Sequence, residues 1–334
     1  SRCRDRTDLT NMRVFMTGGY GCIGAWITRL LLDRNLDVWI YDLKEDTSRL
    51  DMLVRPEEKA RVHFLQGDVA EAKQVHQAIE WVDATHVLHL AGLQVPVCRD
   101  NPILGARVNV LGTLAIFEAA RALKDKIQRV VYASSAAVHG PAQPGEPAVS
   151  DLARLAPSTH YGAFKVCNEQ NARVYWLDHG LHSVGLRPWT VYAVGRAFGV
   201  TSEPTKAIKS VAVGRPYHIS YGGVQDLQYV RDIAEIFLLC LNRPFEGADA
   251  FNIRGAVVPI EQFTSVLAEV VPQARSLVTH GDRQLPIAPD LDDSRLETAF
   301  GPLPRTPLAE GVRDTFDRFA ALWAEQRLSL SDLN

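Results

Sequence analysis

The feature that most constrains the fold is the alternation of short apolar runs with longer segments of helical periodicity. The short runs lie at 13–17, 36–41, 61–66, 85–90, 129–133 and 182–186. Apolar residues at helical spacing separate them at 23–33, 71–81, 102–123 and 161–179. Strands separated by helices of this length predict right-handed βαβ crossovers and a parallel sheet. We therefore expect an α/β fold that binds its ligands at the carboxyl ends of the strands.

The second half of the chain follows a different pattern. Prolines and glycines become denser from Pro188 onward, and the periodic segments shorten to 230–241, 251–253, 260–271 and 308–326. We expect a first domain over 12–186, with a return near 226–254, and a smaller cap domain made mainly of 187–334. Residues 1–11 are polar, and we interpret Met12, just before the first strand, as the native start.

Composition argues against several classes of protein. The net charge of −3 includes no basic excess, so we expect no nucleic-acid partner. We find no apolar run of about 18 residues and expect no membrane span. The five cysteines have no CxxC spacing, which argues against a disulfide framework and against zinc. We expect no bound metal, and a cytoplasmic protein with reduced thiols.

A glycine-rich turn joins the first strand to the first helix. The segment TGGYGCIG spaces Gly18, Gly21 and Gly24 evenly, and Cys22 and Ile23 open the helix. Glycines permit a tight turn, a close approach of the backbone to a pyrophosphate, and close packing of helix on strand. The helix N-terminus offers N–H groups and partial positive charge to phosphates. A glycine pattern alone is also compatible with a plain turn, so its context decides.

That context includes an acidic residue at the end of the next strand. Asp42 is placed to accept hydrogen bonds from the adenosine ribose, and its charge would repel a 2′-phosphate. The sequence therefore predicts NAD rather than NADP, although an exposed loop aspartate is the alternative. Asp68 and Val69 follow the third strand, where an adenine ring would lie. That pair alone is unspecific.

Tyr161 and Lys165 lie one helical turn apart in a Tyr-x-x-x-Lys pattern. A free tyrosine has a pKa near ~10, and a nearby ammonium together with an oxidised nicotinamide would favour the phenolate. Tyr161 would then take a hydroxyl proton as hydride leaves the carbon. Ser135, at a neighbouring strand end, would hold the same oxygen. A Tyr-x-x-x-Lys spacing often arises by chance. The catalytic interpretation is favoured here because the pattern follows the glycine turn and Ser135 in the chain.

Together these motifs resemble the extended short-chain dehydrogenase/reductase family of NAD-dependent epimerases and dehydratases. Further matching segments are HLAG at 89–92, VNVLGT around Asn109, ASSAAVHG around Ser135, LRPWTVY around Arg187 and YVRDIA around Asp232. The resemblance covers 13 to about 301. It implies a Rossmann-type doubly wound parallel sheet with a smaller C-terminal substrate-binding domain. It also implies carbohydrate metabolism and a homodimer formed through the helices at 102–123 and 161–179.

The resemblance also implies roles for individual residues. Ser135, Tyr161 and Lys165 look catalytic. The residues that look like cofactor contacts are Gly18, Gly21, Cys22, Ile23, Gly24, Asp42, Asp68, Val69, Ala91, Gly92, Asn109, Tyr161 and Lys165. Candidate substrate contacts are Gln94, His139, Thr190 and Arg196, with His139 and Gln94 equally compatible with packing.

Departures from the family pattern narrow the reaction. Ala136 and Ala137 stand where dehydratases carry Asp-Glu and decarboxylases need a glutamate. Alanine transfers no proton, so elimination and decarboxylation are disfavoured, and epimerisation or oxidation remains.

The residues expected to bind a nucleoside diphosphate differ as well. Relatives that bind one often carry an asparagine where this chain has Thr190 and an arginine where it has Gln225. They carry a second arginine before a Gly-Asp pair, where this chain has Thr279–Asp282. Glutamine and threonine cannot act as bidentate phosphate donors as arginine does. The sequence therefore argues against a nucleotide-sugar substrate, unless Arg196, Lys206 or Lys209 supplies the missing positive charge.

The sequence thus predicts hydride transfer at a carbinol carbon of a sugar, sugar acid or polyol. A nucleotide-sugar 4-epimerase with tightly bound NAD is the alternative. A non-catalytic NAD sensor is disfavoured because Tyr161 and Lys165 are both present.

Overall fold

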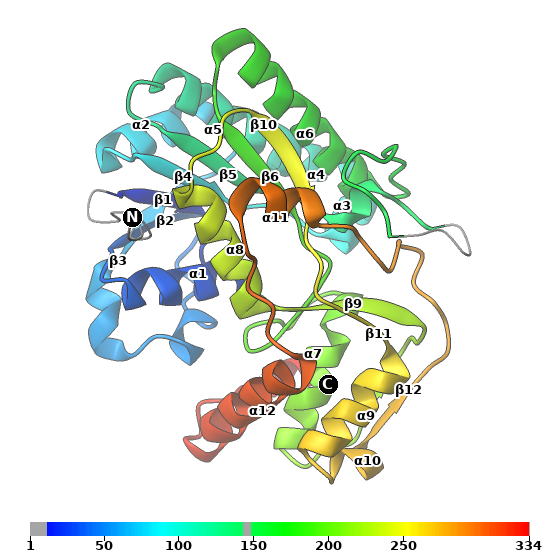
Figure 1. The fold of residues 1–334 in the computed structure, drawn as a ribbon. Helices are drawn as coiled ribbons and strands as arrows, with labels where there is room; N and C mark the ends of the chain where they lie inside the picture. The colour runs from blue at the N-terminus through cyan, green and yellow to red at the C-terminus, as the bar shows by residue number, and fades with distance from the viewer. Residues whose placement is uncertain (1–11, 143–147, 334) are drawn as a thin grey trace, which may run out of the picture.

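A seven-stranded parallel sheet forms the centre of the molecule (Figure 1). The computed structural model describes residues 12–142 and 148–333, so the expectation about residues 1–11 lies outside the described residues. In spatial order the strands are β10 (Ala248–Asn252), β6 (Ser183–Arg187), β5 (Arg129–Ala133), β4 (His86–His89), β1 (Val14–Thr17), β2 (Val38–Asp42) and β3 (Val62–Gln66). The order reverses at β1, which is the doubly wound topology expected from the sequence.

Helices cover both faces of this sheet. Alternate strand residues feed two separate cores: Met16, Ile40 and Val131 face one side, and Phe15 and Val130 face the other. The first core includes α1 (Cys22–Asp33) and α8 (Val230–Asn242); the second includes α2 (Ala72–Val82), α5 (Gly112–Ala122) and α6 (His160–His179). Burial on both faces explains why the strands read as continuous apolar runs rather than alternating ones.

The remaining elements gather below the sheet in Figure 1. They form a sheet of β7 (Thr190–Tyr192), β9 (Val224–Tyr229) and β11 (Ala256–Pro259), and a pair of β8 (Tyr217–Ile219) and β12 (Val278–His280). Their helices are α7 (Glu203–Ala212), α9 (Ile260–Val270), α10 (Ala274–Leu277) and α12 (Leu308–Ala324), while α11 (Ser294–Phe300) lies against β10. The smaller C-terminal substrate-binding part expected from the sequence is thereby confirmed at the level of fold. The division at residue 187 stays a prediction.

The segment expected as one helix at 102–123 consists of three parts. These are α4 (Pro102–Ala106), a π-helical turn (Arg107–Leu111) and α5, preceded by the short α3 (Val95–Asp100). By length and composition, Pro102–Ala122 as a whole is apolar enough to cross a membrane. This differs from the sequence analysis, which found no apolar run of that length. Half of its most apolar window is buried inside the fold, because α5 packs against α2 and α6. It is the sole such helix among the residues described.

Candidate active site

The carboxyl ends of the central strands lie level with one another. The sheet register aligns Thr17 of β1 with Tyr41 of β2 and with His89 of β4, and His89 with Tyr132 of β5. The next residues along these strands therefore share one edge of the sheet: Gly18, Asp42, Leu90 and Ala133. The fold thus brings the predicted cofactor and catalytic segments to one place, although they are far apart in the sequence.

The glycine turn is shaped by contacts that a side chain would block. Gly18 has a φ of +67°, and a Cβ there would lie 2.6 Å from the backbone nitrogen of Ala91. A Cβ on Gly24 would lie 2.6 Å from the Cα of Gly19, where α1 crosses the turn. The N-cap residue of α1 is Gly21, which has no side chain that could cap the helix. The bare turn and its uncapped helix dipole fit the pyrophosphate of a dinucleotide.

Asp42 closes β2 beside this turn. Its Oδ1 accepts the Leu43 N–H at 2.8 Å, and in the described parts of the chain no side chain donates to its carboxylate. Partial burial raises the pKa of Asp42. The carboxylate therefore has free acceptor capacity for ribose hydroxyls.

Asp68 and Val69 have protein partners of their own. Asp68 accepts from the Ala70 N–H at 2.9 Å and from Arg107 at 2.9 Å. Val69 is buried, and a Cβ on Gly112 would lie 2.8 Å from it. Val69 thus packs against the start of α5, and Asp68 ties the end of β3 to the π-helical turn.

Asn109, in the π-helical turn, fixes the loop that follows β4. Its side chain accepts the Leu93 N–H at 2.7 Å and donates to the Leu93 carbonyl at 2.9 Å. A Cβ on Gly92 would lie 3.0 Å from Asn109 Oδ1 and 3.7 Å from Lys165 Nζ. Asn109 therefore positions the loop with both ends of its amide, and Gly92 brings that loop to Lys165.

Ser135, Tyr161 and Lys165 converge at the end of β5. The Ser135 hydroxyl accepts the Ala137 N–H at 3.2 Å, and Ser135 acts to lower the pKa of Tyr161. Thr159 caps α6 by accepting the Gly162 N–H at 3.0 Å, which fixes the turn that carries Tyr161. Lys165 Nζ donates to the Ala133 carbonyl at 2.6 Å and lies 5.5 Å from the centre of the Tyr161 ring.

The protein environment shifts the pKa of both titratable side chains, Tyr161 and Lys165. Burial raises the pKa of Tyr161, although the Ser135 hydrogen bond and the charge of Arg196 act to lower it. Burial lowers the pKa of Lys165 to about 8. The phenolate expected beside an ammonium is therefore not favoured by the protein alone, and the positive charge of an oxidised nicotinamide is the remaining contribution that favours it.

A buried polar network, which the sequence did not indicate, supports α6. Arg187, at the end of β6, makes two hydrogen bonds of 2.8 Å to the Glu169 carboxylate, and Ser134 donates to the same carboxylate at 2.5 Å. Both charged side chains are almost fully buried. A bidentate, desolvated pair of this kind fixes α6 against β5 and β6, so it positions Tyr161 and Lys165.

The four predicted substrate contacts fall into three places. Gln94, at the N-terminus of α3, and Arg196 both lie next to Gly199. The Thr190 hydroxyl is 3.4 Å from Gln225 Oε1 in the interior. His139 is buried with its Nε2 2.7 Å from Asn252 Oδ1 and joins the network around Arg187.

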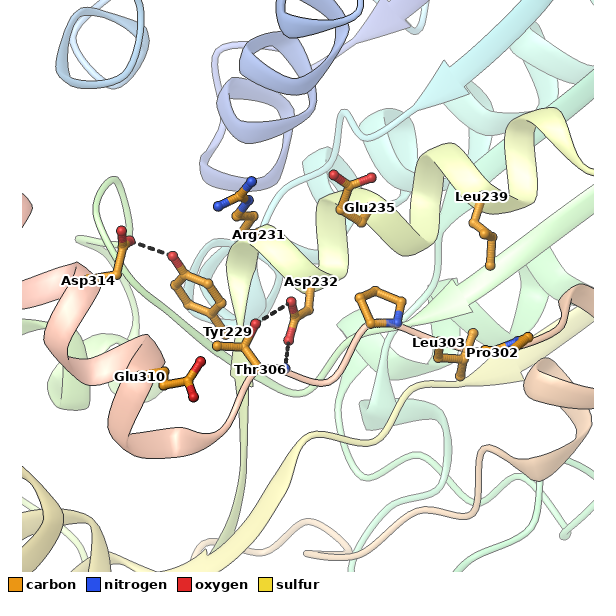
Figure 2. A pocket seen from close by; sticks show the side chains of 11 residues that line it. Tyr229, Arg231, Asp232, Glu235, Leu239, Pro302, Leu303, Thr306, Glu310 and Asp314 are labelled. Atoms are coloured by element: carbon orange, nitrogen blue, oxygen red, sulfur yellow. Dashed lines mark hydrogen bonds between the residues drawn. The ribbon is translucent and has the colours of Figure 1, made fainter. Parts of the chain in front are cut away.

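Two cavities lie away from these residues. One of about 670 Å³ lies between α8 and the start of α12, and Figure 2 shows its lining residues. Asp232 accepts the Thr306 N–H at 2.6 Å and hydroxyl at 2.8 Å, and Tyr229 donates to Asp314 at 2.5 Å (Figure 2). None of the predicted site residues lines this cavity or its 230 Å³ neighbour. The polar side chains at its centre hydrogen-bond with one another, and these bonds connect α12 to α8.

Comparison with known proteins agrees with this geometry. Residues 14–253 match the model of the NAD dependent epimerase/dehydratase family. A UDP-glucose 4-epimerase of Mycolicibacterium smegmatis is 28% identical over 92% of this chain and 98% of its own. A D-erythronate dehydrogenase of Cupriavidus necator is 33% identical over 59% of this chain and 63% of its own.

A solved structure of Thermus thermophilus UDP-glucose 4-epimerase in complex with NAD is 29% identical. It has a TM-score of 0.76 over 92% of this chain and 99% of its own. The cofactor is NAD, which when bound accepts and returns hydride, and the bare glycine turn and Asp42 fit it. The chain is an enzyme, and it belongs to the NAD-dependent epimerase/dehydratase family of extended short-chain dehydrogenases/reductases.

Proposed function

We propose that this enzyme is a dehydrogenase that oxidises a secondary alcohol of a small polyhydroxylated substrate and releases NADH in each cycle. In this proposal Tyr161 accepts the hydroxyl proton, Ser135 holds the reacting oxygen, and Lys165 supports the phenolate. Hydride leaves the same carbon as the proton leaves its oxygen, so the products are a ketone, NADH and a proton.

The observation that carries the proposal is the scarcity of cations for a diphosphate. Gln225, where the family pattern has an arginine, is fully buried and neutral. Lys209, which the sequence offered as a replacement, is buried and already paired with Asp332. Lys206 and Arg196 remain, and Arg196 is held by Thr201 at 2.8 Å. A nucleoside diphosphate needs several charge-assisted donors, whereas a small polyol needs fewer.

The similar proteins include a dehydrogenase and an epimerase, so they are compatible with oxidation and with epimerisation. D-erythronate dehydrogenase is named for a small sugar acid, which is the substrate size we propose. UDP-glucose 4-epimerase, which resembles this chain over a longer span, makes epimerisation of a nucleotide sugar the second candidate.

We further propose that the residues predicted to contact NAD do so, except that Asp68, Val69 and Asn109 act by shaping the site. We also propose a homodimer, supported by exposed apolar side chains on Pro102–Ala122 and α6, among them Ile103 and Leu177. A cytoplasmic location is supported by the four cysteines of the described chain, which are all free.

The test is the growth of the reduced-nicotinamide absorbance when protein and NAD meet sugars, alditols, aldonic acids and UDP-sugars. Continuing growth with a small compound, abolished in Tyr161→Phe while NADH still binds, is the expected result. Tightly bound NAD, with interconversion of UDP-sugars and no net NADH, would establish the epimerase instead. Full activity in Tyr161→Phe would refute the assigned proton acceptor.

A further inference from the structure

Arg196 is a cation at the candidate active site without an anionic partner in the described chain. It follows a tight turn after β7, where its backbone N–H donates to the Ala193 carbonyl at 3.1 Å. A Cβ on the preceding Gly195 would lie 3.8 Å from Cys22 Sγ, so the turn that carries Arg196 lies against the start of α1. Burial raises the pKa of Tyr161, and the charge of Arg196 acts in the opposite direction.

The guanidinium of Arg196 has unused donors. Its Nη2 donates to the Thr201 hydroxyl at 2.8 Å, while its Nε is buried and has no partner among the described residues. A guanidinium has five N–H donors, and pairs of them match the two oxygens of a carboxylate. The guanidinium donors that Thr201 does not use are therefore available to pair with a carboxylate.

Neutral polar groups lie beside this cation, and Arg49 donates to the carbonyl of the neighbouring Gly195 at 3.0 Å. A Cβ on Gly199 would lie 3.1 Å from Gln94 Oε1 and 3.8 Å from Arg196 Nη2, so the amide and the guanidinium flank one point. Tyr221 is fully buried, and its hydroxyl has no described partner. The Nε2 of the fully buried Gln225 likewise has no described partner.

We propose that Arg196 binds the carboxylate of a hydroxy-acid substrate, with Gln94 as a neutral hydrogen-bonding group beside it. The guanidinium of Arg196 can balance one negative charge. A diphosphate carries at least twice that charge, and Lys209 is already neutralised by Asp332. This inference rests on the proposed oxidation, since it names the class of compound that the same site oxidises.

The experiment compares sodium salts of four- to six-carbon aldonic acids with the alditols of the same carbon chains, using NAD and the absorbance of NADH. We expect the acids to be preferred, and Arg196→Gln to raise their KM by about 100-fold. Arg196→Lys should recover part of this loss, because it keeps the charge but not the paired donors. Arg215→Gln, an exposed arginine on the turn before β8, is the matched control.

Two further measurements separate the possible explanations. NADH affinity, measured by fluorescence, should change less than about threefold in Arg196→Gln; an equal loss of NADH binding would assign Arg196 to the cofactor and overturn the proposal. Titration of NADH-loaded protein with the aldonates tests binding even if no compound is oxidised. Binding that depends on Arg196 without turnover would sink the proposed oxidation alone. Preference for alditols, or inhibition by UDP but not by aldonates, would overturn the carboxylate site.

Discussion

At the scale of single residues, the burial of Lys165, the proposed catalytic lysine, lowers the stability of the fold. Burial lowers the pKa of Lys165 to about 8 from 10.5, a difference equivalent to roughly 3 kcal/mol of unfolding free energy below pH 8. Between pH 8 and 10.5 the unfolded chain binds more protons than the folded one, so this contribution to stability rises with pH. Residues with such penalties are typical of active sites.

Lys165→Met should therefore stabilise the cofactor-free protein at pH 7 while abolishing turnover. The stabilising difference from the wild-type enzyme should shrink as the pH approaches 10, because the wild-type lysine is then neutral in the fold. Urea unfolding at pH 7 and at pH 9.5 measures this difference, with the exposed Lys124→Met as the control. A difference that does not change with pH would contradict the assigned burial penalty.

Ala193 provides a second prediction at this scale. It is fully buried and has a φ of +135°, a region that side chains disfavour, and its carbonyl accepts from Arg196. Such a conformation is unfavourable by about 1–3 kcal/mol. Ala193→Gly should relieve this strain, so its effect on unfolding free energy should be neutral or stabilising.

The matched control is Ala84→Gly, because Ala84 is also buried in a loop but has no such conformation. It should destabilise the protein by about 0.5–1 kcal/mol, the usual effect of glycine. Thermal unfolding of both variants provides the comparison. Equal destabilisation by the two changes would show that Ala193 is not strained.

At the scale of elements, we expect the end of β2 to determine which cofactor binds. The carboxylate of Asp42 has free acceptor capacity beside the glycine turn and would repel a 2′-phosphate. Asp42→Ser should weaken NAD and admit NADP, changing the ratio of their kcat/KM values by about 10- to 100-fold. Asp46→Ser, in the loop that follows, is the control. An unchanged cofactor ratio in Asp42→Ser would remove Asp42 from the ribose site.

The elements that the sequence predicted are those with strong periodicity and a defined end. The strands before Gly18, Asp42 and Ser135 were anticipated because apolar runs stopped at turn residues. The strands β7, β8 and β12 have three residues each, too few for a pattern of period two to be recognised.

Contacts between side chains of different elements could not be predicted from the sequence, for a different reason. Glu169 read as one charge on an ordinary helix, yet it forms a buried pair with Arg187. The two residues belong to different elements, and only their register in the fold brings them together. Asn109 was recognised from the family motif, but its use of both amide ends on Leu93 depends on the π-helical turn.

At the scale of the whole molecule, the open question is what covers the outer side of Pro102–Ala122 and α6. Ile103 is 82% exposed and Leu177 is 60% exposed, and α4 and α5 both pack against α6. Two neighbouring helices thus present large apolar side chains to solvent. Exposed apolar side chains on neighbouring helices are compatible with an interaction site, and a second copy of the chain is the partner proposed above.

The double variant Ile103→Glu, Leu177→Glu should therefore shift the protein from dimer to monomer. Light scattering after size exclusion should give twice the 37.0 kDa chain mass for the wild-type enzyme and the chain mass for the variant. Trp81→Glu, which changes a 71% exposed apolar side chain on α2, should leave the dimer intact. Because two buried glutamates of like charge would be strongly unfavourable in the proposed interface, a variant that stays dimeric would place the interface on another surface.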